Sequence, residues 1–411
     1  MRQSLLLSCA LAPLLTLAAC GGGGTGTTAT TAAVATTPSP APAPATPTPS
    51  PAATSATPTG VADFTTVDFA AIANYASPTL PAYYDATVAA DDNTPAGNAI
   101  TDRVATLGRV LFYDKRLSTN DTTSCASCHQ QANGFTDPRR FSTGVSGAAF
   151  TTAHAMRLGN IRYYRPGSMF WDKRAASVEA QASQPIQNVI EMGWDGAAGG
   201  LPALITKMNA TSYYPDLFTF AFGSATITEA RIQQALAQFE RAMVSAGSKW
   251  DTGYATVFSA TAPNRNLNVD LANFSAQENR GRTLFMTGPG AGGAGCAACH
   301  VPPTFALAPN SQSNGLDAGE TIVFKSPSLK NVAIVGPYMH DGRLATLADV
   351  VEHYNSGVQN GPALDNRLRP GGVPQRLNLS VADKAALVAF MQTLTDTNLV
   401  VDPKFSNPFK K

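Results

Sequence analysis

Two copies of one short pattern carry the most specific chemistry in this chain of 411 residues. They read Cys125-Ala-Ser-Cys128-His129 and Cys296-Ala-Ala-Cys299-His300. In a C-x-x-C-H pattern, the two thiols add to the two vinyl groups of a haem, and the adjacent histidine reaches the iron as its proximal ligand. Each motif is therefore expected to hold one c-type haem through its cysteines, with His129 and His300 as iron ligands.

Zinc and disulfide bonds are the alternative uses of these cysteines. The two pairs of a zinc site usually lie about 15–20 residues apart, and Cys128 and Cys296 are far more distant than that. Disulfides form outside the cytoplasm, but they do not explain a histidine after each pair. The remaining two of the six cysteines, Cys9 and Cys20, lie close to the N-terminus. Two covalent haems are the preferred interpretation.

The N-terminal residues predict export. Residues 1–20 begin with Arg2, continue as an apolar stretch and end in small residues, which is typical of a secretory signal peptide. The final Leu-Ala-Ala-Cys resembles a bacterial lipobox, in which Cys20 becomes the lipid-modified N-terminus; an ordinary signal with a chance cysteine is the alternative. We therefore expect a periplasmic protein that is anchored to a membrane by lipid. Gly21 after Cys20 resembles sorting to the outer membrane.

Composition predicts a tether and excludes some classes of function. Residues 21–60 contain only Gly, Thr, Ala, Pro, Ser and Val, so this segment is expected to be a disordered tether, and the folded part begins near Val61. The chain has 29 basic and 28 acidic residues, which argues against a nucleic-acid-binding protein. No long apolar run follows the signal, so no internal transmembrane helix is expected.

A repeated segment precedes each haem motif. Gly-Arg-Val-Leu-Phe at residues 108–112 is matched by Gly-Arg-Thr-Leu-Phe at residues 281–285, which indicates two related units. Helix signals dominate: Thr228 and Ser380 are candidate N-caps, and Ser275 with Glu278 forms a capping box. We expect a mainly α-helical chain with few short strands. It would form two cytochrome-c-like haem domains in tandem, over residues 61–225 and 226–411.

Several further stretches resemble the bacterial di-haem cytochrome c peroxidase and MauG family. They are LGRVLFYDKRLS at 107–118, FWDKRA at 170–175, the run from Gln181 to Met192, and FKSPSLKNVAIVGPYMHDG at 324–342. The resemblance covers roughly residues 100–400 in order. It implies two haem domains that face each other, with peroxide reacting at the N-terminal haem and electrons entering through the C-terminal haem.

The resemblance also implies catalytic residues. Trp171 matches the tryptophan that lies between the two haems and helps electrons cross, although most tryptophans are simply core residues. Gln181 and Glu191 match the polar pair of the peroxide pocket. A carboxylate beside the open face of the iron can move a proton between the two peroxide oxygens. Without the resemblance, Glu191 would be interpreted as a solvated surface acid.

Two further positions bear on the N-terminal haem. Peroxidases of the family often carry a distal histidine before the matching tryptophan, but residues 143–147 read TGVSG and His154 is out of register. The first haem is therefore expected to keep an open sixth position, with His154 as a surface residue or a neighbour of a calcium site. The family's usual calcium ligand, an asparagine near His154, is missing. The carbonyls around Val335 and Pro337 remain candidates for a calcium ion.

The sixth ligand of the C-terminal haem decides the subclass. Cytochrome c peroxidases place a methionine fourteen residues after the histidine of HDG, and Tyr354 stands at that distance from His340. A helix capped by Thr346 would turn Tyr354 inward with its apolar residues and His353 toward the polar side. Met339 and His353 remain alternatives. Tyrosine here resembles MauG, and an oxygen ligand favours ferric and higher states over reduced iron.

The resemblance implies two functions, and a third applies to any protein with several haems. The first is a di-haem peroxidase that reduces hydrogen peroxide with electrons from a small c-type cytochrome or a cupredoxin. The second is a MauG-like oxidase, which uses the oxidising state formed with peroxide to remove electrons from a partner protein. The third is an electron carrier without enzymatic activity, which predicts that both irons are six-coordinate. Members of the family often dimerise, so a homodimer is left open.

Overall fold

The computed structural model describes residue 58 and residues 60–410. The expected signal peptide and nearly all of the expected tether lie outside this part of the chain. Within it helices predominate, and the only strands are β1 (His300–Val301) and β2 (Ala306–Leu307), which pair antiparallel. The prediction of a mainly α-helical chain with few short strands is confirmed. None of the described helices has the length and apolar character needed to cross a bilayer.

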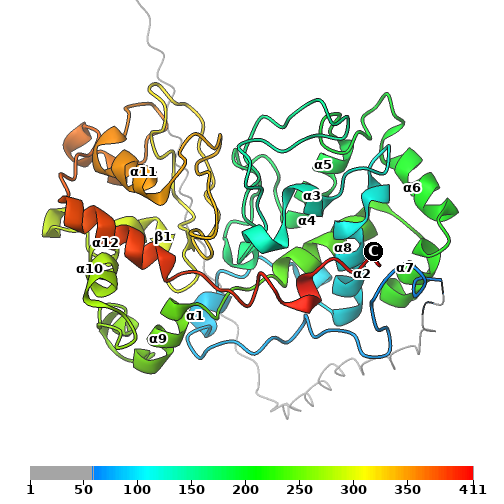
Figure 1. The fold of residues 1–411 in the computed structure, drawn as a ribbon, viewed down its shortest axis with the longest axis horizontal. Helices are drawn as coiled ribbons and strands as arrows, with labels where there is room; N and C mark the ends of the chain where they lie inside the picture. The colour runs from blue at the N-terminus through cyan, green and yellow to red at the C-terminus, as the bar shows by residue number, and fades with distance from the viewer. Residues whose placement is uncertain (1–57, 59, 411) are drawn as a thin grey trace, which may run out of the picture. The chain divides into compact units, whose positions relative to one another are not determined.

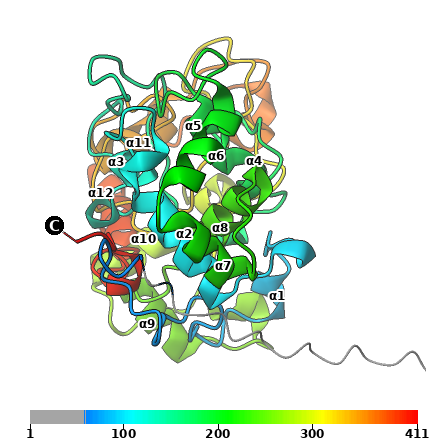
Figure 2. The same ribbon diagram turned by 90° about the vertical axis from the view of Figure 1, so that its right-hand side faces the viewer.

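Two helices cross closely in the first half of the folded part. They are α2 (Asp102–Tyr113) and α8 (Glu229–Arg241), which lie side by side in both views (Figures 1 and 2). Thr101 and Thr228 cap their N-termini by accepting hydrogen bonds from backbone N–H groups. A Cβ atom on Gly108 would lie 2.0 Å from the carbonyl oxygen of Ala235. Glycine is therefore required at this crossing.

The second half repeats this crossing with α10 (Ala276–Met286) and α12 (Val381–Gln392) (Figure 1). A capping box between Ser275 and Glu278 begins α10, and Ser380 caps α12. A Cβ atom on Gly281 would lie 1.9 Å from the carbonyl oxygen of Ala386. The glycine of each Gly-Arg-x-Leu-Phe segment thus has the same role, which agrees with the predicted internal repeat.

Most of the other helices are shorter than those of the two pairs. They are α1 (Ala86–Ala89), α3 (Cys125–Cys128), α4 (Val178–Ala182), α5 (Gln184–Gln187), α6 (Gly200–Ala210), α7 (Tyr214–Phe222), α9 (Lys249–Val257) and α11 (Leu347–Glu352). A π-helical turn over His353–Gly357 follows α11 directly. The first haem motif forms α3, whereas the second begins as a 3₁₀ turn over Cys296–Ala298 and continues into β1.

Two hydrophobic cores divide the folded part, but they do not follow the expected boundary at residue 225. Helix α8 begins after that boundary, yet its buried side chains belong to the first core with those of α2. Segments also cross between the halves: Phe405 near the C-terminus packs in the first core, and Tyr83 packs in the second. Val61, where the folded part was expected to begin, is fully buried in the first core.

Candidate functional site

The first haem motif presents its residues from a short helix. Cys125 and Cys128 are free thiols at the two ends of α3, and the next residue is His129. His129 Nδ1 lies 3.1 Å from the carbonyl oxygen of Phe135. A carbonyl can only accept, so Nδ1 donates its proton and leaves Nε2 with a free lone pair. Burial lowers the pKa of His129, which favours the neutral imidazole that an iron ligand requires.

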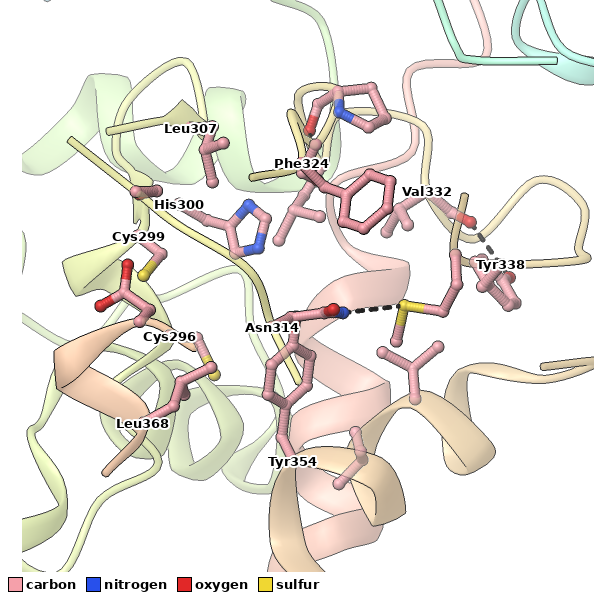
Figure 3. Close-up of a pocket in the computed structure, with 18 of the residues that line it drawn as sticks. Cys296, Cys299, His300, Leu307, Asn314, Phe324, Val332, Tyr338, Tyr354 and Leu368 are labelled. Atoms are coloured by element: carbon pink, nitrogen blue, oxygen red, sulfur yellow. Dashed lines mark hydrogen bonds between the residues drawn. The ribbon is translucent and has the colours of Figure 1, made fainter. Parts of the chain in front are cut away.

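The second motif opens on a large cavity of about 370 Å³. Cys296, Cys299 and His300 lie along one side, and Tyr354 stands on another (Figure 3). Burial lowers the pKa of His300 to about 4, so its imidazole is neutral at physiological pH. His300 Nδ1 is buried and has no hydrogen-bond partner. Two free thiols and a neutral histidine around a mainly apolar cavity fit a covalently bound haem.

Asn314 contacts every candidate for the sixth ligand of this second haem. Its Nδ2 lies 3.4 Å from the hydroxyl oxygen of Tyr354 and 3.3 Å from the sulfur of Met339 (Figure 3). The backbone carbonyl oxygen of Asn314 lies 3.1 Å from His353 Nε2. Tyr354 lines the cavity together with Leu347, Val350 and Val351, as the helical spacing predicts. The phenol and the thioether therefore both face the space in which a haem would lie.

The expectation that His353 faces the polar side is wrong. His353 stands in the π-helical turn that follows α11, and the segment that carries Asn314 covers it, so the side that was expected to be polar is buried. His353 is only 8% exposed, and its Nε2 is already bonded to Asn314. In this conformation His353 is held outside the lining of the cavity.

Trp171 is fixed by hydrogen bonds at both its ring and its backbone. Its Nε1 donates to the carbonyl oxygen of His154 at 2.8 Å, and its own carbonyl accepts from the backbone N–H of Lys325 at 2.6 Å. The indole lies edge-on to the ring of His340, with 6.4 Å between the ring centres. Because Trp171 also lines the His300 cavity, it borders the site of the second haem.

Glu191 lies in a second cavity of about 340 Å³, on the side of the first haem motif. The lining residues are Phe170, Arg174, Gln184, Pro185, Gln187, Asn188 and Glu191. Burial raises the pKa of Glu191, and the charge of Arg174 partly opposes this effect. Burial raises the pKa of Cys125 and Cys128, and the charge of the Glu191 carboxyl adds to this effect, so Glu191 lies within electrostatic range of both thiols.

Gln181, the second residue expected in this pocket, is not part of its lining. It lies on α4, and Gln184 at the start of α5 contributes to the cavity instead. The structure therefore brings Glu191 together with Gln184 and Arg174, which the sequence did not single out. Both residues lie within stretches that resemble the family. Nothing in their spacing along the chain indicates that they would lie beside Glu191.

His154 is not the surface residue that was expected. It is 4% exposed. Its Nε2 lies 3.2 Å from the hydroxyl oxygen of Thr136, and its Nδ1 lies 3.2 Å from the backbone carbonyl oxygen of Arg140. Both ring nitrogens are therefore engaged. Among the described residues that line the Glu191 cavity there is no histidine, methionine, cysteine or tyrosine. The lining also lacks Cys125, Cys128 and His129, so an open position beside the first haem stays a prediction.

The proposed calcium position gains no support from the contacts. The carbonyl oxygen of Val335 accepts a hydrogen bond from the guanidinium of Arg157 and so already faces a cation. In the described part of the chain, Asp317, Glu320 and His340 form a cluster with the spacing of metal ligands. Asp317 is held there by an ion pair with Arg343 at 2.6 Å. Calcium remains a prediction.

Comparison with known proteins agrees with this geometry. The family model described as di-haem cytochrome c peroxidase matches residues 102–256. Methylamine utilization protein MauG of Methylorubrum extorquens is 32% identical over 318 residues, which are 73% of this chain and 80% of that protein. Cytochrome c551 peroxidase of Nitrosomonas europaea is 28% identical over 332 residues, 74% of this chain and 84% of that protein.

A solved structure supports the same assignment. The crystal structure of a MauG-like protein associated with microbial copper homeostasis has 30% sequence identity and a TM-score of 0.63, and the match covers 77% of this chain and 96% of that one. The diheme peroxidase BthA from Burkholderia thailandensis shares the fold, with a TM-score of 0.57 at 21% identity. The chain therefore belongs to the di-haem cytochrome c peroxidase and MauG family of oxidoreductases, a family that implies two c-type haems.

Proposed function

We propose that this protein reduces hydrogen peroxide at the His129 site and takes the two electrons from a protein partner by way of the His300 site and Trp171. Two protons and two electrons convert one hydrogen peroxide into two waters. Peroxide is the oxidant and the partner supplies both electrons, so the reaction balances. When bound, the two haems supply redox-active iron, one for the reaction with peroxide and one for passing electrons on. The free thiols and neutral imidazoles of both motifs support this assignment.

Glu191 is the proposed proton-transfer residue. Its carboxylate would accept the proton of the peroxide oxygen that binds first and return it to the oxygen that leaves as water. Burial raises the pKa of this carboxyl, which makes it a better acceptor and a readier donor near neutral pH than an exposed glutamate. Gln184 and Arg174, in the same cavity, are placed to orient the polar end of a small oxidant.

The partner's own side chains are the proposed source of the electrons, as in a MauG-like oxidase. The observation that supports this choice is Tyr354, whose hydroxyl faces the His300 cavity at the position where a cytochrome c peroxidase is expected to have a methionine. A phenol oxygen ligand favours oxidised over reduced iron. A site poised in this way is suited to withdrawing electrons from aromatic residues of a partner protein.

A peroxidase that is fed by a small cytochrome or cupredoxin is the second candidate. Met339 favours it, because its sulfur faces the same cavity and contacts the same asparagine as the phenol. A thioether ligand favours reduced iron and rapid electron entry. The two candidates thus differ in which side chain coordinates the second haem. For either, we propose that export and lipid attachment at Cys20 place the enzyme in the periplasm at the outer membrane.

Two measurements test the proposal. Electron paramagnetic resonance of the resting ferric protein should show one high-spin and one low-spin haem; two low-spin signals would identify an electron carrier and exclude the open pocket. In stopped flow, one equivalent of peroxide is mixed with the protein, with or without a reduced small c-type cytochrome. Fast oxidation of the cytochrome indicates the peroxidase. A long-lived oxidised protein that the cytochrome scarcely reduces indicates the MauG-like oxidase.

A further inference from the structure

Two buried cations border the His300 cavity without an acidic partner. Lys325 is 2% exposed, and its Nζ lies 3.2 Å from the sulfur of Met156 and 4.9 Å from the centre of the Tyr164 ring. Arg157 is 7% exposed; it donates to the carbonyl of Val335, and its Nε has no partner. Neither cation pairs with a carboxylate in the part of the chain that the structure describes.

Other buried cations of this fold are paired. Lys330 Nζ lies 2.5 Å from Asp251, Arg241 lies 2.5 Å from Glu179, and Arg282 lies 2.7 Å from Asp270. A buried charge that lacks a partner costs several kcal/mol even after the surroundings relax. The unpaired state of Lys325 and Arg157 is therefore exceptional, and it occurs where both side chains line one cavity. We therefore expect an anionic group to bind in this cavity beside the two side chains.

We infer that Lys325 and Arg157 bind the propionate carboxylates of the haem in the His300 cavity. The propionates are the anionic part of a haem, and a charge-assisted hydrogen bond to a carboxylate suits both an ammonium and a guanidinium. A third cation in the lining, Arg367, already forms an ion pair with Asp365 at 2.7 Å. Lys325 and Arg157 are thus the buried cations of the lining that lack a carboxylate.

The same two segments also hold Trp171. The backbone N–H of Lys325 donates to the carbonyl of Trp171, and the indole N–H of Trp171 donates to the carbonyl of His154, three residues before Arg157. Binding of the propionates would therefore fix the haem and the tryptophan through shared backbone. Lys325 and Arg157 act here as positioning residues. The inference depends on a haem in the His300 cavity and not on the source of the electrons.

Redox titration of the holoprotein tests the inference. Lys325→Met removes the charge, keeps an unbranched side chain and leaves Trp171 bonded to the backbone. Because a nearby positive charge favours uptake of an electron, we expect the equilibrium constant for reducing one haem to fall about tenfold, which is about 59 mV for one electron. Arg157→Met should shift the same haem in the same direction, and Lys325→Arg should return its potential toward that of the wild type.

Lys173→Met is the matched control, since this lysine is near enough to lower the pKa of Lys325 but does not line the cavity. Unchanged potentials in Lys325→Met and Arg157→Met would overturn the inference, as would an equal shift in Lys173→Met. If Lys325→Met retains fewer than two haems, Lys325→Arg decides: two haems in that variant support the inference, and fewer count against it. The titration measures reduction potentials and not peroxide turnover. A protein that binds both haems but does not reduce peroxide would therefore contradict the proposed function and leave this inference standing.

Discussion

Phe170 and Trp171 are consecutive in the chain, yet they line different cavities. Phe170 borders the cavity of Glu191, and Trp171 borders the cavity of His300. Phe170 has a φ of 66°, in the left-handed region, which bends the chain at this point. The two residues therefore form a wall between the proposed peroxide pocket and the proposed electron-entry site. This relationship joins the aromatic ring of Trp171 to the Glu191 cavity through a single peptide bond.

The first prediction concerns this link. Trp171→Phe should slow electron transfer between the two sites at least tenfold, which corresponds to about 1.4 kcal/mol of barrier. The indole N–H bond to His154 is lost as well, at a cost to stability of about 1 kcal/mol. Stopped flow after reduction of the second haem measures the rate. Trp194→Phe is the control, because Trp194 also donates to a backbone carbonyl but lines neither cavity; equal slowing in both variants would contradict the proposed route.

The second prediction concerns Glu191. Glu191→Gln should slow the reaction with peroxide by about 10²–10⁴-fold, the usual contribution of a positioned acid or base. In the wild type the rate should fall as the pH drops through the raised pKa of Glu191, because the protonated carboxyl cannot accept a proton. This decline should begin above the ordinary pKa of a glutamate, and it should be absent in Glu191→Gln. A rate within about twofold of the wild type, with the same pH profile, would exclude the role.

The third prediction concerns the ligand of the second haem. Tyr354→Met should raise the reduction potential of that haem, because a thioether favours reduced iron more than a phenol oxygen does. Asn314→Leu should remove the contact that holds the phenol and the sulfur of Met339 together, and so alter the spectrum of the same haem. Spectroelectrochemistry and electron paramagnetic resonance measure both effects. An unchanged spectrum and potential in Tyr354→Met would show that Tyr354 is not a ligand.

The fourth prediction concerns a buried acid beside the first haem motif. Burial raises the pKa of Glu240 to about 8, and its Oε2 has no hydrogen-bond partner. Its carboxyl adds to the effect of burial in raising the pKa of Cys125. The folded protein then keeps a proton that the unfolded chain releases near pH 4.5, so stability should decrease as the pH rises from about 4.5 to about 8. Full ionisation would cost on the order of 5 kcal/mol.

Thermal unfolding of the wild type and Glu240→Gln at pH 5 and pH 8 measures this effect. The melting temperature of the wild type should fall between the two pH values, and the fall should be much smaller in Glu240→Gln. Equal decreases in the two proteins would show that another group causes the pH dependence. The quantity compared is the fall in melting temperature between pH 5 and pH 8. Any change in stability that the substitution causes equally at both pH values therefore cancels.

The sequence predicted what depends on local rules. The haem motifs, the caps at Thr228, Ser275 and Ser380, and the repeated glycine segments follow from short-range spacing, and the structure agrees with them. Helical spacing also placed Tyr354 correctly in the lining with Val350 and Val351. These features need only the geometry of one helix or the steric demands of one close contact.

The remaining features depend on tertiary contacts. His353 was expected on a polar side because its contact with Asn314 joins distant parts of the chain, and His154 is buried by contacts with Thr136 and Arg140 that are also distant in sequence. The place of α8 in the first core depends on its packing against α2 rather than on distance along the chain. The unpaired state of Lys325 is visible only when the whole cavity has been assembled.

The matched helix crossings at Gly108 and Gly281 have a consequence for how such an enzyme can evolve. Each crossing is fixed by a backbone contact, of Gly108 with Ala235 or of Gly281 with Ala386, and none of these four residues lines either cavity, although other residues of α10 and α12 line the His300 cavity. Mutation can therefore diversify the chemistry of one half while the frame of both stays intact. A duplicated scaffold of this kind can specialise one copy for reaction with oxidant and the other for relaying charge.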